Sequence, residues 1–219
     1  MRIYLKLSKN RQLVPFNYQL LLTGAIHKWL GPDNELHGRR SLFCFSWLQA
    51  VETTKKGINT RPGSYFFIGA HDELLIKRLV KGIMASPELC CGIHITELQL
   101  MKEPEFSEQQ YFYTASPVFL KQRTDKGDQH IFYDDQQATA LLTEGMKAKL
   151  EMAGLSAEGL RIAFDRDYAG AKTKLVSYKG IGNKASICPV EITGTPEQIA
   201  FAWNVGVGNS TGIGFGALK

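Results

Sequence analysis

The chain has 219 residues, of which 44% are hydrophobic, 26 are Lys or Arg and 21 are Asp or Glu. This length can bury one large core or form two domains of about a hundred residues each, and the net charge of +5 permits an anionic partner such as a nucleic acid. No apolar run approaches the ~18 residues of a membrane span. The four cysteines include no C-x-x-C pair, which argues against a zinc site or a disulfide framework. We therefore expect a cytoplasmic protein with no membrane partner.

The first half predicts strands and helices in the order β-α-β-β-α-β. Residues 2–7 alternate apolar and polar side chains, as in a half-buried strand, whereas apolar residues recur at helical spacing over 17–30. The remaining elements are strands at 42–48 and 65–68, a helix at 72–84 and a strand at 92–102. This order is that of the ferredoxin-like, or split βαβ, unit found in many RNA-binding domains.

The second half repeats this order less regularly. The expected elements are strands at 111–120, 160–164, 172–178 and 185–192 and a helix at 134–152. Thr195, Pro196 and Gln198 supply an N-cap, a proline at the first helical position and a capping-box glutamine for a further short helix. A polar stretch separates the halves, so we expect an α+β protein with two tandem ferredoxin-like (βαββαβ) domains. Their expected ranges are 1–107 and 108–219.

The segment 206–216 is the richest in glycine, which occupies five of its eleven positions. Glycine permits a positive φ and a close approach to the backbone, and successive N–H groups in such a turn can bind an anion. A P-loop is excluded because no Gly-Lys-Ser/Thr follows. A dinucleotide fingerprint is excluded because Thr211 stands where glycine is needed.

We therefore expect a phosphate-facing loop followed by a final strand with bare backbone on one face, against which a ligand or another chain could lie. A tight hairpin whose glycines serve packing alone is the alternative. The loop residues that could bind RNA are Gly206, Gly208, Asn209, Ser210, Thr211 and Gly212.

Two histidines are candidates for acid–base chemistry. His27 lies on the first helix opposite the apolar stripe, and His37 lies in the following loop beside two arginines. Each could simply be solvated surface. Two imidazoles and a guanidinium nevertheless suit RNA transesterification, because one imidazole can take the 2′-hydroxyl proton and the other can protonate the leaving 5′-oxygen. This chemistry needs no metal and no cofactor. The weaker candidates are His71, His94 and His130.

At this point the sequence resembles the CRISPR-associated endoribonucleases that cut precursor CRISPR transcripts within each repeat. The matching segments are 14–18, Leu36-His37 ahead of 42–46, 84–88, 115–118 and the terminal glycine motif at 206–216. The resemblance implies two tandem ferredoxin-like domains, metal-independent cleavage to a 2′,3′-cyclic phosphate and a 5′-hydroxyl, and a catalytic histidine at His37.

This sequence departs from the family pattern at two places. Some relatives have tyrosine where His27 stands, and a lysine shortly after the catalytic histidine where this chain has Arg39, Arg40 and Ser41. Either arginine could stabilise charge on the phosphorane. We favour Arg40 because it adjoins the strand at 42–48, and we assign Arg39 to RNA binding.

The expected partner is CRISPR repeat RNA. Basic residues at or beside strands of the second half are further candidates for phosphate contacts, namely Arg161, Arg166, Lys172 and Lys174. The alternative function is that of a non-catalytic RNA-binding subunit of a CRISPR effector complex. Subunits of such a complex and a second copy of the chain are therefore further candidate partners.

Overall fold

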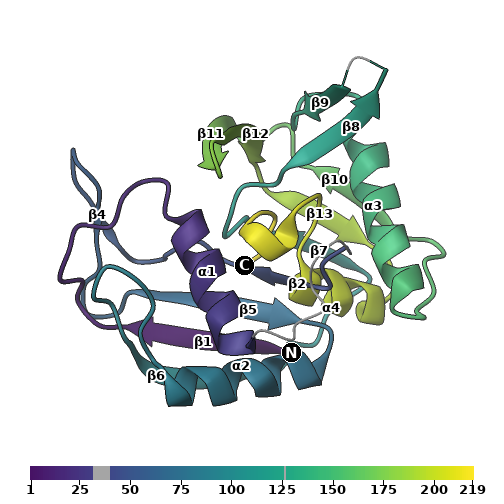
Figure 1. Cartoon of the computed structure of the whole chain (residues 1–219). Coiled ribbons are helices and arrows are strands. Elements are labelled where there is room, and N and C mark those ends of the chain that lie inside the picture. Colours follow the sequence, from purple (N-terminus) through teal and green to yellow (C-terminus); the bar gives the residue numbers. More distant parts are fainter. Residues whose placement is uncertain (32–39, 126) are drawn as a thin grey trace.

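The computed structural model describes residues 1–31, 40–125 and 127–219. Two antiparallel sheets, one from each half of the chain, lie side by side, and the C-terminal segment lies between them (Figure 1). The fold is therefore α+β and consists of two ferredoxin-like halves. None of the described helices has the length and apolar character needed to cross a membrane.

The first sheet has the strand order β2-β5-β1-β6, with every neighbouring pair antiparallel. Its elements are β1 (Arg2–Leu7), α1 (Gln19–Leu30), β2 (Phe43–Phe45), β5 (Tyr65–Ala70), α2 (Glu73–Ala85) and β6 (Ile95–Met101). Side chains from α1 and α2, such as Leu22, Ile26 and Leu79, form one core with Leu5 and Ile68 of the sheet. The predicted order of the first half is thereby confirmed. A short hairpin, β3 (Glu52–Thr53) and β4 (Ile58–Asn59), forms where only a loop was expected.

The second sheet has the order β10-β13-β7 and is covered by α3 and α4. The elements are β7 (Gln109–Phe112), α3 (Ala138–Met152), β10 (Arg161–Phe164), β13 (Val190–Thr193) and α4 (Pro196–Val205). The capping box predicted at Thr195 and Gln198 is confirmed. In place of a fourth strand, residues 217–219 pair with 113–115, and the N–H groups of Tyr113 and Lys219 each donate to the other's carbonyl at 3.0 and 2.8 Å.

Several expected boundaries in the second half were wrong. The expected strand at 111–120 ends at Phe112, and a hairpin of β8 (Leu120–Thr124) and β9 (Gly127–Ile131) follows it. The expected strand at 185–192 is two strands, because Pro189, which has no N–H, separates β12 (Ile181–Ile187) from β13. β12 pairs with β11 (Lys172–Tyr178) in a separate hairpin. We propose that the domains divide at 107/108, in the connection between β6 and β7.

The glycine-rich segment does not form the expected final strand. Residues 211–213 form a short 3-10 helix, η1 (Thr211–Ile213), and the backbone then turns through positive φ at Gly214 and Gly216. A Cβ on Gly208 would lie 2.6 Å from the carbonyl oxygen of Phe119, and one on Gly216 would overlap the carbonyl of Val207. Another part of the same chain therefore lies against this bare backbone, as the packing alternative requires.

The guanidinium of Arg2 joins the two halves. It is fully buried between the rings of Phe67 and Trp203, whose centroids lie 4.4 and 3.6 Å away. Its Nη1 donates to the carbonyl of Leu218 at 2.8 Å, and its Nη2 donates to the carbonyl of Trp203. Burial lowers its pKa to about 10, so the group stays charged at neutral pH. The first strand is thus tied to α4 and to the C-terminal residues.

The contact between α1 and α2 yields a test of this packing. A Cβ on Gly82 would lie 2.6 Å from the Cα of Trp29, whereas a Cβ on Gly145 of α3 would meet no atom within 4 Å. We expect Gly82→Ala to lower the free energy of unfolding by about 1–3 kcal/mol through overpacking. Gly145→Ala should instead raise it by about 0.5–1 kcal/mol, because alanine is the better helix former.

Chemical denaturation of both variants measures these free energies. Equal effects of the two substitutions would contradict the close approach of the two helices at Gly82.

Candidate functional site

The half-buried His27 lies in the last turn of α1, on the stripe that Gln19 and Thr23 begin. This stripe was expected to face solvent. Gln19 and Thr23 are instead buried at 1% and 4% exposure, since α1 contacts η1 and the Cγ of Gln19 lies against Gly214. Leu21, one of the apolar residues of this helix, is instead 39% exposed. The stripe that ends in His27 therefore begins against the glycine-rich segment, at the contact of Gln19 with Gly214.

Arg40 is exposed and lies three residues before Phe43, the first residue of β2. The next residue, Ser41, packs tightly on η1, because a Cβ on Gly212 would overlap its Oγ and lie 3.0 Å from the Cζ of Phe43. The hydroxyl of Thr211 also donates to the carbonyl of Ser41 at 3.5 Å. The glycine-rich segment thus fixes the backbone next to Arg40. His37 and Arg39 lie outside the described residues, so their places in the site stay predictions.

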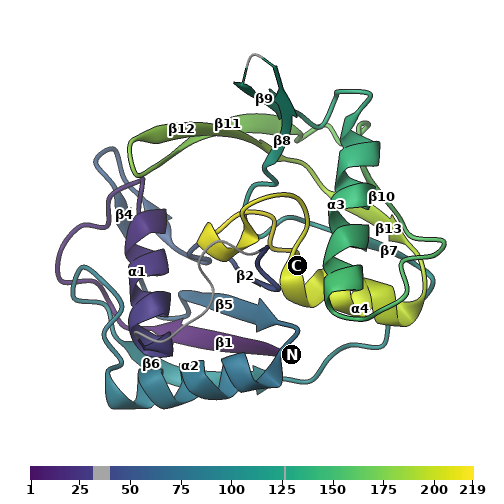
Figure 2. The ribbon, with the colours of Figure 1, turned by 45° about the vertical axis from the view of Figure 1, so that its right-hand side comes forward.

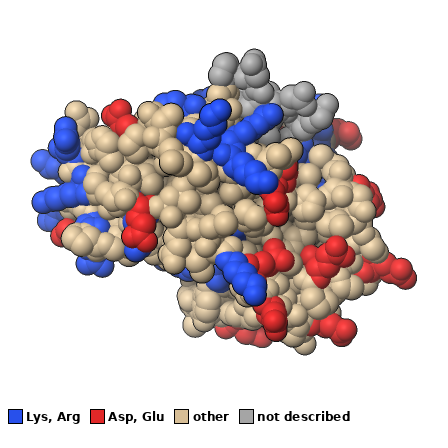
Figure 3. Space-filling view, turned by 90° about the horizontal axis from the view of Figure 1, so that it is seen from below, with Lys and Arg blue, Asp and Glu red and all other residues tan. Residues whose placement is uncertain are grey.

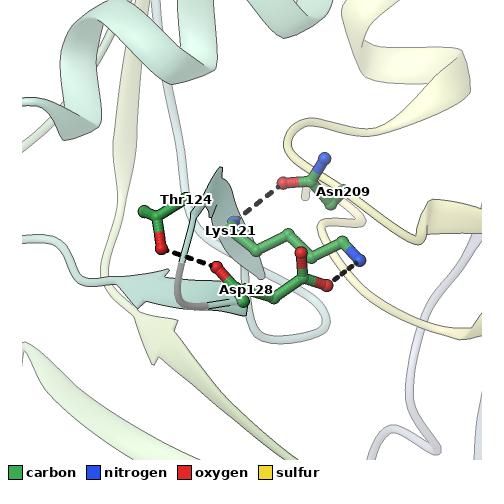
Figure 4. Close-up of polar contacts among 5 residues, drawn as sticks. Lys121, Thr124, Asp128 and Asn209 are labelled. Carbon is green, nitrogen blue, oxygen red and sulfur yellow. Dashed lines mark hydrogen bonds and ion pairs between the residues drawn. The ribbon is translucent and has the colours of Figure 1, made fainter.

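The loop at 206–212 shows little of its surface. Ser210 is exposed, Gly208 and Asn209 are half-buried, and the remaining members are buried. Asn209 also ties the loop to the β8–β9 hairpin, because its Oδ1 accepts the Lys121 N–H at 3.0 Å (Figure 4). Ser210 is thus the member of this set best exposed to a ligand, and the binding role of all six remains a prediction.

The basic candidates of the second half lie on different elements. Lys172 and Lys174 belong to the β11–β12 hairpin, which extends over η1 towards the first half (Figure 2). The Nζ of Lys174 lies 4.9 Å from the centre of the Trp47 ring, and the Nε1 of Trp47 donates to the carbonyl of Gly214 at 3.0 Å. Trp47 therefore links Lys174 to the glycine-rich segment.

The other two basic candidates flank β10. Arg161 is the exposed first residue of that strand, and Arg166 follows its end. A guanidinium nitrogen of Arg166 donates to the carbonyl of Asp135. Through this contact Arg166 holds the loop that precedes α3.

A cavity of about 620 Å³ lies elsewhere, between the β6–β7 connection and α4. Three glutamates line it, namely Glu103, Glu105 and Glu197. Figure 3 shows one face on which acidic side chains gather on one side and basic side chains on the other. Carboxylates repel a phosphate backbone, so the cavity is a poor RNA site. Among the described residues, no group of three or more His, Cys, Asp and Glu side chains is placed to hold a metal ion.

Sequence reasoning missed Lys149 of α3. It is 5% exposed, and its Nζ donates to the carbonyl of Gly206 at 3.0 Å and to the hydroxyl of Thr211 at 3.3 Å. A signal was present, because Lys149 lies three residues after the inward Met146 and directly before the inward Leu150. Lysine is rarely buried, so a lysine on this stripe indicates a specific contact.

Comparisons with known proteins agree with this fold. The family model described as CRISPR associated protein Cas6, C-terminal, matches residues 101–219. A protein of Methanocaldococcus jannaschii named CRISPR-associated endoribonuclease Cas6 1 is 24% identical over 235 aligned residues, which cover all of this chain and 92% of the relative.

Two solved structures share the fold with a TM-score of 0.87 each. One is of a Cas6-related protein from Pyrococcus furiosus, 24% identical, with 100% of this chain and 97% of the other covered. The second is described as a RAMP protein binding different RNA substrates, 20% identical, with 100% and 98% covered. Because the family model spans more than half of the sequence, this chain belongs to the Cas6 family of CRISPR-associated proteins.

Proposed function

We propose that this protein is a metal-independent endoribonuclease that cleaves CRISPR precursor RNA within each repeat and so matures guide RNAs. The observation that carries the proposal is that one glycine-rich segment contacts both α1, the helix that carries His27, and Ser41, which follows Arg40, in a member of the Cas6 family. The relative from Methanocaldococcus jannaschii is named as an endoribonuclease, which supports the same activity here. We place this activity in the cytoplasm.

In the proposed reaction, the 2′-oxygen of the nucleotide before the cut attacks the adjacent phosphorus. The bond from phosphorus to the 5′-oxygen then breaks, which leaves a 2′,3′-cyclic phosphate and a 5′-hydroxyl. One of His27 and His37 accepts the 2′-hydroxyl proton and the other donates a proton to the leaving oxygen. Arg40 stabilises the charge that develops on the phosphorane oxygens. Each of these roles is a proposal.

A non-catalytic RNA-binding role is the second candidate. Two of the solved structures that share the fold are described as Cas6-related and as binding different RNA substrates. In that role the protein would hold repeat RNA for other effector subunits, or as a dimer, without cutting it. Incubation with repeat RNA in EDTA separates the two candidates. The nuclease yields products with 2′,3′-cyclic phosphate ends, whereas bound but intact RNA would favour the binding subunit.

The histidine pair gives a sharper test of the chemistry. We expect His27→Ala and His37→Ala each to slow single-turnover cleavage by about a hundredfold to ten-thousandfold, because each removes a proton transfer of the transition state. Affinity for the RNA should change little. His94→Ala is the matched control and should cleave at the wild-type rate, because His94 directly precedes β6 and bonds Ser8 only through backbone atoms of its own. Wild-type rates in both variants of the pair would remove these histidines from the mechanism.

The hairpin lysines give a test of the RNA path. Replacing Lys172 and Lys174 with methionine should weaken binding and lower the slope of log affinity against log salt by about 1.4, at about 0.7 per phosphate contact on a single strand. The control is the same double substitution at Lys77 and Lys81 of α2, which removes equal charge from the first half. If both double variants lower the slope equally, the hairpin has no specific contact with the RNA.

A further inference from the structure

The buried ammonium of Lys149 has no carboxylate partner among the described ion pairs. Its acceptors are a carbonyl and a hydroxyl, which cancel little of its charge. Burial of an unpaired charge costs several kcal/mol in general, so a lysine is retained at such a position only if its contacts or its charge serve the protein.

The contacts of Lys149 lead directly to the candidate site. Its Nζ holds Gly206 at one end of the loop and Thr211 at the other, and the same hydroxyl of Thr211 donates to the carbonyl of Ser41. Ser41 directly follows Arg40. One buried side chain from α3 thus joins the second half, the glycine-rich loop and the segment that leads into β2.

The positive charge of Lys149 also interacts with the charged groups around it. The pKa of its ammonium is lowered to about 8, chiefly by burial; the buried thiol of Cys44 opposes this shift, and the charge of Arg40 adds to it. The hydroxyl of Thr211 and the carbonyl of Ser41 link Lys149 to the backbone beside Arg40, so the two positive charges disfavour one another. An anion bound beside Arg40 would relieve this repulsion and favour the charged form of Lys149.

We propose that Lys149 is a positioning residue for RNA, whose ammonium holds the loop at 206–211 against the backbone beside Arg40 and attracts the RNA phosphates from beneath that loop. The proposal rests on the proposed RNA-binding function. Lys149 would thus belong to the site without contact to the reacting atoms or to solvent. Its role is to place Arg40 and to supply positive charge from beneath the loop.

The first test measures RNA affinity against pH, using repeat RNA with a 2′-deoxy nucleotide at the cut so that it stays intact. The wild type should lose about tenfold in affinity between pH 7 and pH 9, because a lysine with a lowered pKa gives up its proton as pH rises through about 8. Lys149→Met should bind about tenfold more weakly at pH 7 and show little further loss by pH 9. Lys149→Gln serves the same purpose if the methionine variant does not fold.

Lys147→Met is the matched control. Lys147 lies on the same helix, is 35% exposed and pairs with Glu144 at 3.2 Å, so its loss should leave the pH dependence as in the wild type. A merely structural lysine would not shift the pH profile in this way, since a neutral amine still donates hydrogen bonds. The proposal is wrong if Lys149→Met keeps the wild-type pH dependence.

The second test needs no RNA. Hydrogen exchange of residues 206–213 and 41–45 should be at least tenfold faster in Lys149→Met than in Lys147→Met, and exchange in β1 and β5 should be unchanged. Equal exchange in the two variants would overturn the positioning role. If the wild type binds no repeat RNA at all, the proposed function fails, and the exchange comparison still decides what Lys149 does.

Discussion

The close packing of the glycine-rich segment against both halves of the chain is the constraint on which the candidate site depends. At Gly208 the segment meets the carbonyl of Phe119, and at Gly212 it meets Ser41 and Phe43. Any side chain at these positions would push the halves or the loop apart. Glycine therefore serves chain packing first, and whatever the loop binds must use its exposed tip at Ser210 and the neighbours it positions.

Two buried cations bind the chain within and on both sides of the glycine-rich segment. Arg2 of the first strand reaches the carbonyls of Trp203 and Leu218, and Lys149 reaches Gly206 and Thr211. Both donate to backbone carbonyls that helix ends and turns leave without partners. Burying each cation has an unfavourable desolvation free energy. In exchange, each cation fixes the distance between chain segments that are far apart in sequence.

The sequence predicted most of the fold because local patterns determine most of its elements. The capping box at Thr195 and the period of α2 are local signals, and both were read correctly. The final strand was not, since alternating glycines suit a strand and a close-packed turn equally well until their neighbours are known. The outer face of α1 was misread for the same reason, because η1, which lies nearly two hundred residues away in the chain, contacts this helix, and Gly214 lies against Gln19. His27 was proposed from its residue type and stays a prediction, whereas the burial of Lys149 depends on a tertiary contact.

The central claim is that RNA is cut by its own 2′-hydroxyl between the histidines and Arg40. The most direct measurement replaces the single 2′-hydroxyl before the scissile phosphate with hydrogen and compares cleavage and binding with the unmodified repeat RNA. This change deletes the nucleophile and leaves nearly every other contact in place. Our account predicts that cleavage at that bond stops while affinity stays within a few fold. Continued cleavage of the modified RNA at the same bond would contradict it.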